Sequence, residues 1–201
     1  MRRRLLTAAV NPLAIKLEPL VSLTTGALVG VEALMQTVDL NRIRRDPMLA
    51  GDVLTAAAAA TLCPTIWVNV EPHHVDHRPL QTRLHHLAHF FGLNVVIEIT
   101  ERGPLPATDT IAALHDLGFT VALDDVPPAQ IADAVALGAD IIKIDYPASS
   151  VELAAISNTV TAAGHRLVVE GIETGEQHSA ACASGAHIGQ GWLYHKAEAV
   201  A

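Results

Sequence analysis

Residues 94–145 read NVVIEITERGPLPATDTIAALHDLGFTVALDDVPPAQIADAVALGADIIKID, and this stretch decides the fold. Short runs rich in Val and Ile, at Asn94–Thr100, Thr120–Asp125 and Asp140–Asp145, alternate with Ala-rich segments that have a helical pattern. Strands that are apolar almost throughout are buried on both faces, as in a parallel sheet covered by helices. The stretch therefore predicts consecutive β/α units.

The same alternation continues on both sides of this stretch. The other predicted strands are Ala14–Leu23, Val29–Leu34, Thr65–Val70, Arg166–Gly171 and His187–Trp192. The predicted helices are Met48–Leu62, Pro79–Phe91, Ala107–Leu117, Ala129–Leu137, Val151–Ala163 and Thr174–Ser184. The turn residues 24–27 lie between the first two strands, so we expect an antiparallel hairpin there.

About eight strands in this order predict an α/β fold, a TIM-like (β/α)8 barrel with an antiparallel first strand. An open doubly wound sheet is the alternative on pattern alone. No linker or low-complexity stretch divides the chain, so we expect one domain over residues 1–201.

Composition limits the classes of partner. The chain has 201 residues, a formal net charge of −8 and no basic run, which makes it a poor binder of nucleic acid polymers and anionic membranes. No apolar run reaches transmembrane length. Met1–Arg4 followed by Leu5–Val10 imitates a signal peptide but lacks a clear cleavage site, so we expect an ordinary N-terminus and a cytoplasmic protein.

Polar side chains occur near the C-terminal end of strand after strand. They are Glu32, Asn69, Glu98, Asp124, Asp125, Lys143, Glu170 and Gln190. In a barrel these ends open onto one mouth, and carboxylates packed there cannot all stay ionised unless a cation lies among them. Oxygen ligands favour Mg²⁺ or Mn²⁺ over zinc, and the adjacent Asp124 and Asp125 suit a two-metal site.

Helix caps or loop salt bridges are the alternative for any one of these residues. Glutamates within the apolar runs themselves favour a shared site, because caps prefer Ser, Thr, Asp and Asn. Glu101, Asp145 and Glu173 lie two or three residues beyond site candidates. Each of them either supports a metal-binding neighbour or carries a solvated loop charge.

These residues form a recognisable set, and the chain resembles the EAL domain family of cyclic di-GMP phosphodiesterases and receptors. Seven motifs follow in order between about residues 18 and 194. They are Glu32-Ala33-Leu34, Trp67-Val68-Asn69-Val70, Glu98-Ile99-Thr100-Glu101, Leu123-Asp124-Asp125, Lys143-Ile144-Asp145, Glu170-Gly171-Ile172-Glu173 and Gln190-Gly191.

The resemblance implies a TIM-like barrel with an antiparallel first strand, and hydrolysis of cyclic di-GMP to linear pGpG with two Mg²⁺ or Mn²⁺ ions. The positions matching the ligands of the first ion are Glu32, Asn69, Glu98 and Asp124, and those of the second are Asp124, Asp125 and Glu170. Lys143 matches the lysine that orients the attacking water, and Glu170 has also been assigned as general base. Leu34 belongs to the signature, and Glu173 and Gln190 match residues lining the same pocket.

The chain also departs from the family pattern. Val126–Ala129 replaces a Phe-Gly-Thr-Gly loop, Gln36 replaces an arginine that contacts substrate phosphate, and Glu18 replaces a glutamine. The segment 36–66 is shorter than usual. Three functions stay open: a phosphodiesterase with slow or regulated turnover, a receptor that binds cyclic di-GMP without cleaving it, and a protein-interaction module. A homodimer or a partner protein is compatible with each.

The two tryptophans lie in strand patterns. We expect Trp67 and Trp192 to be core residues, with stacking of Trp192 on a guanine as the alternative.

Overall fold

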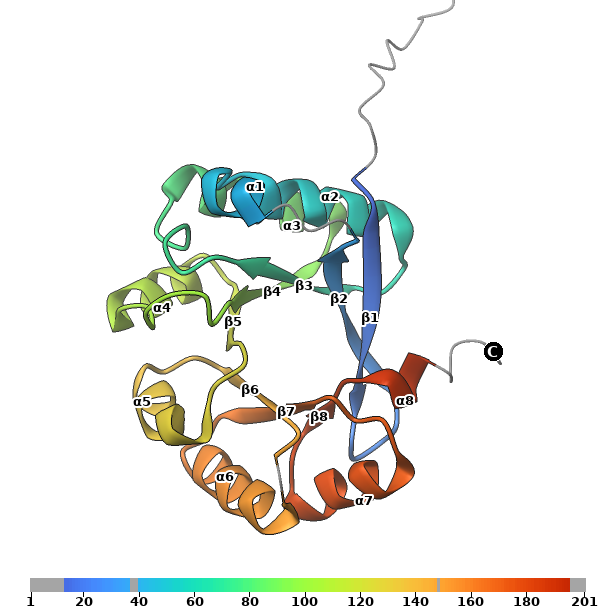
Figure 1. Cartoon of the computed structure of the whole chain (residues 1–201). Coiled ribbons are helices and arrows are strands. Elements are labelled where there is room, and N and C mark those ends of the chain that lie inside the picture. The colour runs from blue at the N-terminus through green and yellow to red at the C-terminus, as the bar shows by residue number, and fades with distance from the viewer. Residues whose placement is uncertain (1–12, 37–39, 148, 196–201) are drawn as a thin grey trace, which may run out of the picture.

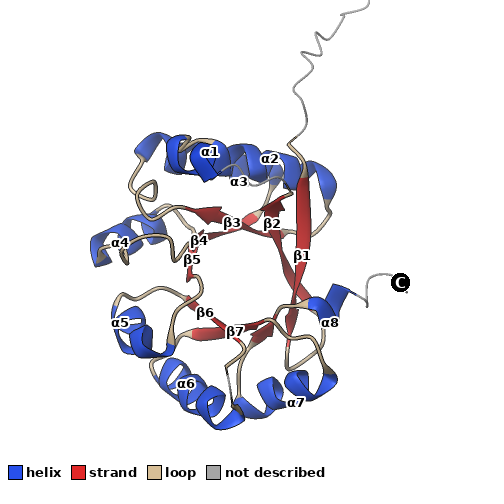
Figure 2. Ribbon diagram, viewed as in Figure 1, coloured by secondary structure: helices blue, strands red, loops and turns tan. Residues whose placement is uncertain are grey.

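The computed structural model describes residues 13–36, 40–147 and 149–195, and within these ranges the strands close into a barrel surrounded by helices (Figures 1 and 2). The strands are β1 (Ile15–Ser22), β2 (Leu28–Met35), β3 (Thr65–Val70), β4 (Asn94–Ile99), β5 (Thr120–Leu123), β6 (Ile141–Asp145), β7 (Arg166–Glu170) and β8 (Ile188–Gly189). The predicted TIM-like (β/α)8 barrel is confirmed. The segment that imitates a signal peptide lies outside the described residues.

The first strand runs against the others. β1 pairs antiparallel with both β2 and β8, and every other neighbouring pair of strands is parallel. The hairpin between β1 and β2 closes through Gly26, whose φ of 72° suits glycine, and through a hydrogen bond from the Ser22 N–H to the Ala27 carbonyl. The antiparallel first strand is therefore confirmed.

Helices cover the outside of the barrel. They are α1 (Leu40–Arg45), α2 (Leu49–Ala60), α3 (Arg78–Phe91), α4 (Thr108–Asp116), a 3₁₀ turn η1 (Pro128–Gln130), α5 (Ile131–Ala136), α6 (Ser150–Ala162), α7 (Gly175–Ser184) and α8 (Trp192–His195). None of the helices in the described part of the chain has the length and apolar character needed to span a bilayer.

The prediction for the end of the chain is wrong. β8 ends at Gly189, and Trp192 begins α8 with 58% of its surface exposed. Gly191 explains the difference, because its φ is 143° and a Cβ there would lie 2.4 Å from the backbone nitrogen of Ile172. The chain turns at a position open only to glycine. Trp67, by contrast, is buried as predicted.

Alternation along the strands produces two apolar layers. Outward-facing residues such as Val68, Ile97 and Ile142 pack with helix residues in the larger hydrophobic core. Inward-facing residues form a separate plug inside the barrel. It consists of Leu20, Trp67, Val96, Ala122, Ile141, Val168 and Ile188.

Gly30 of β2 leaves space for the largest side chain of the plug. A Cβ at this position would lie 2.8 Å from Nε1 of Trp67. We expect Gly30→Ala to lower the free energy of unfolding by about 1–3 kcal/mol, because the rigid indole must shift. Urea denaturation measures the effect. Gly175→Ala is the control, since a Cβ there meets nothing within 4 Å, and equal stability of both variants would contradict the prediction.

Candidate active site

A polar layer lies directly above the apolar plug. Along a strand, side chains two residues apart share a face, so each plug residue is followed by a polar residue nearer the mouth. The inward pairs are Trp67 and Asn69, Val96 and Glu98, Ala122 and Asp124, Ile141 and Lys143, Val168 and Glu170, and Ile188 and Gln190. In the antiparallel β1, Glu18 takes this place two residues before Leu20. The barrel therefore gathers the predicted candidates at one end.

Lys143 of β6 lies at the centre of this layer, with only 1% of its side chain exposed. Its Nζ lies 3.0 Å from Glu170 Oε1, 3.1 Å from Asp124 Oδ1 and 3.5 Å from Glu32 Oε2. It also forms an ion pair with Glu98. One ammonium group is thus shared by four carboxylates.

The negative charge around Lys143 exceeds what one lysine can neutralise. Burial raises the pKa of Glu98 well above its usual range and the pKa of Glu170 to about 8, and neighbouring carboxylates add to both shifts. Burial opposes the charge of Lys143, but the surrounding carboxylates outweigh it and raise the pKa of this lysine. Among the described residues, the Oε2 atoms of Glu98 and Glu170 are buried without a hydrogen-bond partner. An oxygen-binding cation such as Mg²⁺ or Mn²⁺ fits this donor set.

Two amides hold Glu32 in a fixed orientation. Asn69 Nδ2 donates to Glu32 Oε1 at 2.7 Å, and Gln190 Nε2 donates to Glu32 Oε2 at 2.6 Å. Gln190 also reaches Glu18 Oε2 at 3.3 Å, and Glu18 accepts a hydrogen bond from Lys16 at 2.6 Å. The charge of Glu18 is therefore compensated by a lysine of the same strand.

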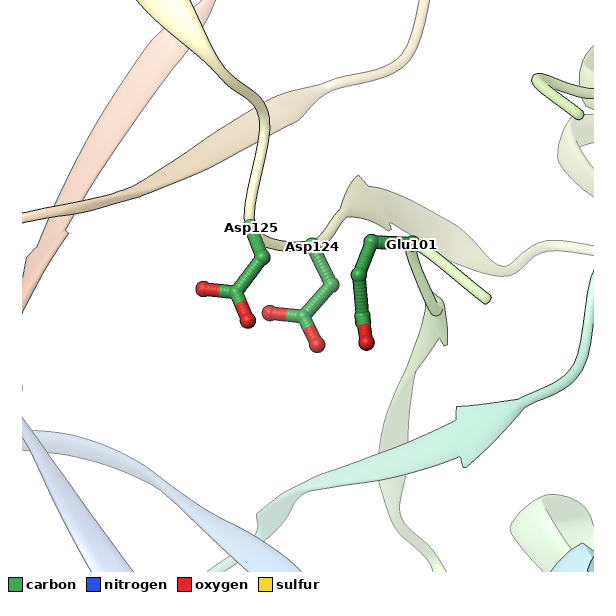
Figure 3. Close-up of side chains that lie close together, drawn as sticks. All are labelled: Glu101, Asp124 and Asp125. Atoms are coloured by element: carbon green, nitrogen blue, oxygen red, sulfur yellow. The ribbon is translucent and has the colours of Figure 1, made fainter. Parts of the chain in front are cut away.

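A second carboxylate cluster extends from this layer. One carboxylate oxygen each of Glu101, Asp124 and Asp125 lies within 4.8 Å of the others, and Figure 3 shows the three side chains next to one another. Asp125 has a φ of 44°, a strained conformation of the kind found at functional sites. The next residue, Val126, connects this loop to β6, because its N–H donates a hydrogen bond to the Lys143 carbonyl at 2.9 Å. The loop that carries Asp125 is therefore held against β6.

Burial raises the pKa of Asp125 to about 6, and the charges of Asp124, Asp145 and Glu101 add to the shift. Of the two roles left open for Glu101, its position beside the aspartates favours support of a metal site. Asp145 is exposed and acts on Asp125 through its charge. Glu173 is exposed, and its N–H donates to Gln177 in the first turn of α7. The structure does not bring the Glu173 carboxylate into the clusters described above.

A cavity of about 250 Å³ extends from the mouth beneath α1 and α2. Its lining includes Glu32, Leu34, Asn69, Asp124 and Asp125, together with apolar residues of the two helices. Sequence reasoning missed α1 and two further lining residues, Glu71 and Arg102, which form an ion pair. Their positions gave one signal: each lies just after the polar end of one of two neighbouring strands.

The raised pKa of Glu170 predicts how stability depends on pH. Glu170 keeps its proton in the folded state up to about pH 8, whereas the unfolded chain loses it near 4.5. The folded state therefore binds more protons in this window, so the metal-free protein should lose a few kcal/mol of stability as the pH rises through it. Urea denaturation with a chelator measures the loss, and Glu170→Gln should flatten the profile. If the stability of the wild type and of Glu170→Gln fell equally with rising pH, Glu170 would not be the group responsible.

Comparisons with known proteins identify a matching family profile and similar sequences. A sequence profile of the EAL domain matches residues 59–197. The cyclic di-GMP phosphodiesterase PdeL of Escherichia coli (strain K12) is 36% identical over 119 residues, which cover 51% of this chain and 32% of PdeL. The probable cyclic di-GMP phosphodiesterase PdeB of the same organism is 24% identical over 217 residues, which cover 90% of this chain and 42% of PdeB. The chain spans less than half the length of these curated relatives.

The fold has solved counterparts. BlrP1 of Klebsiella pneumoniae, determined as a manganese/cyclic di-GMP complex at pH 9.0, superimposes with a TM-score of 0.73 at 20% identity. The superposition covers 96% of this chain and 57% of BlrP1. The sequence profile begins only at residue 59, within the shortened segment 36–66, whereas this structural match includes most of the chain before residue 59.

Proposed function

Because the chain belongs to the EAL domain family, we propose that it is a metal-dependent phosphodiesterase that hydrolyses cyclic di-GMP to linear pGpG. One observation carries the proposal: four carboxylates surround the buried Lys143, and two of their buried oxygens have no partner among the described residues. Burying so many acidic groups is costly unless cations join them. The names of PdeL and PdeB support the substrate, and the BlrP1 complex supports both ligand and metal.

We assign two metal positions to the mouth. By the family resemblance, Glu32, Asn69, Glu98 and Asp124 would hold one ion, and Asp124, Asp125 and Glu170 would hold the second. In the structure Asp124 and Asp125 lie close enough, together with Glu101, to share one ion. Glu101 supports the second position from the neighbouring loop. Mg²⁺ or Mn²⁺ bound there neutralises phosphoryl charge and makes water acidic enough to react near neutral pH.

The remaining residues position the attacking water and the substrate, and one of them accepts a proton. Glu170 is the general base: its Oε2 has no protein partner in the described chain and can accept a proton from water. Lys143 orients that water with its ammonium group. Water gives a proton to Glu170 as its oxygen bonds to phosphorus, the P–O3′ bond breaks, and the leaving 3′ oxygen takes up a proton from the solvent. Gln190 keeps Glu32 in place, and Leu34 contacts the substrate from the cavity wall.

Product analysis tests the proposal. The purified protein is incubated with cyclic di-GMP and Mn²⁺ or Mg²⁺, and the nucleotides are separated by chromatography. We expect pGpG that requires the metal and is absent with the Glu32→Ala variant, because Glu32 contacts Lys143, Asn69 and Gln190. Absence of product over many hours would overturn the proposal. Binding measured by calorimetry would then indicate a receptor, and lack of binding an interaction module.

A further inference from the structure

The cavity at the mouth is lined by many acidic side chains and by one arginine. Its acidic lining residues are Glu32, Asp46, Glu71, Glu101, Asp124 and Asp125. Arg102 is the only arginine or lysine among the described residues that line it. A cyclic dinucleotide carries one negative charge on each of its two phosphodiesters. The acidic lining therefore repels such a substrate unless a positive group contacts it.

Glu71 orients the guanidinium group of Arg102. Its Oε1 accepts a hydrogen bond from Nε at 2.8 Å and lies 2.5 Å from Nη2. The Glu71 side chain is 4% exposed, whereas that of Arg102 is 36% exposed, so the pair is anchored on the protein side. Nη1 has no protein partner within the described ranges and keeps its N–H donors for another group.

The two loops that carry this pair are packed closely together. Glu71 follows β3 and Arg102 follows the adjacent β4. A Cβ at Gly103 would lie 3.2 Å from the side chain of Pro72, so the two loops touch at the residues after the ion pair. The close contact fixes the guanidinium beside the carboxylates instead of leaving it on a long, free arm.

We propose that Arg102, oriented by Glu71, donates through Nη1 to a phosphodiester oxygen of the dinucleotide and sets its affinity. The proposal rests on the function proposed above and adds to it the residue that recognises the anion. The positive charge of the cavity lining at the mouth comes from Arg102 in the loop after β4.

Steady-state kinetics and metal-free titration with cyclic di-GMP test this assignment. Arg102→Ala should raise KM and Kd about 10- to 100-fold while kcat changes less than about threefold, because the contact forms on binding. The KM and Kd of Arg102→Lys should lie between those of Arg102→Ala and the wild type, since lysine keeps the charge but lacks the planar guanidinium group. Arg166→Ala is the matched control: Arg166 is exposed at the start of β7, at the end of the barrel opposite the mouth. It should match the wild type.

Arg102→Ala leaves a buried glutamate without its partner, so a folding defect must be separated from a binding defect. The double variant Arg102→Gln with Glu71→Gln removes both charges and should show the same rise in Kd with a normal melting temperature. Unchanged KM and Kd in a folded double variant would overturn the role of Arg102. Binding by the wild type without product, weakened in this variant, would overturn only the phosphodiesterase. If the wild type neither binds nor cleaves the nucleotide, both proposals are wrong.

Discussion

Lys143→Met should lower the free energy of unfolding of the metal-free protein by about 3–5 kcal/mol, the cost of leaving buried charges uncompensated. The substitution keeps the length of the side chain but removes the ammonium that Glu32, Glu98, Asp124 and Glu170 share. Part of the cost can be avoided if these carboxylates take up protons. The loss should therefore be larger at pH 8 than at pH 5.

Urea denaturation in the presence of a chelator measures this loss, and addition of Mn²⁺ should restore part of the stability. Lys16→Met is the control, since Lys16 is half exposed and pairs only with Glu18 in the described chain. We expect a cost below about 1 kcal/mol there. Similar losses in both variants would show that the carboxylates of the mouth do not depend on Lys143.

Glu98→Gln should lower catalytic activity without lowering the stability of the metal-free protein. We expect kcat/KM to fall by about 10³-fold or more, because a neutral amide is a poor ligand for a hard cation. The metal-free variant should be at least as stable as the wild type. Burial raises the pKa of Glu98, so the folded state disfavours its charge, and the amide removes that charge without changing the shape.

Enzyme assays and chelator-treated unfolding on the same preparations test both halves of this prediction. Glu176→Gln is the matched control, because Glu176 lies exposed in the first turn of α7 and should leave both quantities nearly unchanged. A Glu98→Gln variant that is clearly destabilised would mean that its ion pair with Lys143 outweighs the cost of burial. Retained activity would remove Glu98 from the metal site.

The barrel and its polar layer could be predicted because they follow from one-dimensional patterns. Continuous apolar runs fix the strands, and a polar residue at a strand's end must reach the mouth once the barrel closes. Glu98 and Lys143 are such cases. What the pattern could not show is that Lys143 meets four carboxylates at once, because that depends on side-chain reach across the barrel.

The features that were missed depend on contacts between distant segments. The strand predicted through Trp192 ends early because Gly191 lies against Ile172. The Glu71–Arg102 pair forms only because the loops after β3 and β4 are neighbours in the sheet. A buried glutamate in a loop cannot be told from a solvated one by its neighbours in the sequence.

The antiparallel β1 has a consequence for how other protein segments can reach the site. Ile15 pairs with Met35 at the mouth end of β2, and His195 of α8 lies 3.9 Å from Glu18, so the described chain enters and leaves at the mouth. A domain tethered before Leu13 or after His195 would have a high effective concentration at the opening. Such a domain could block or admit substrate directly, without a conformational signal passing through the barrel.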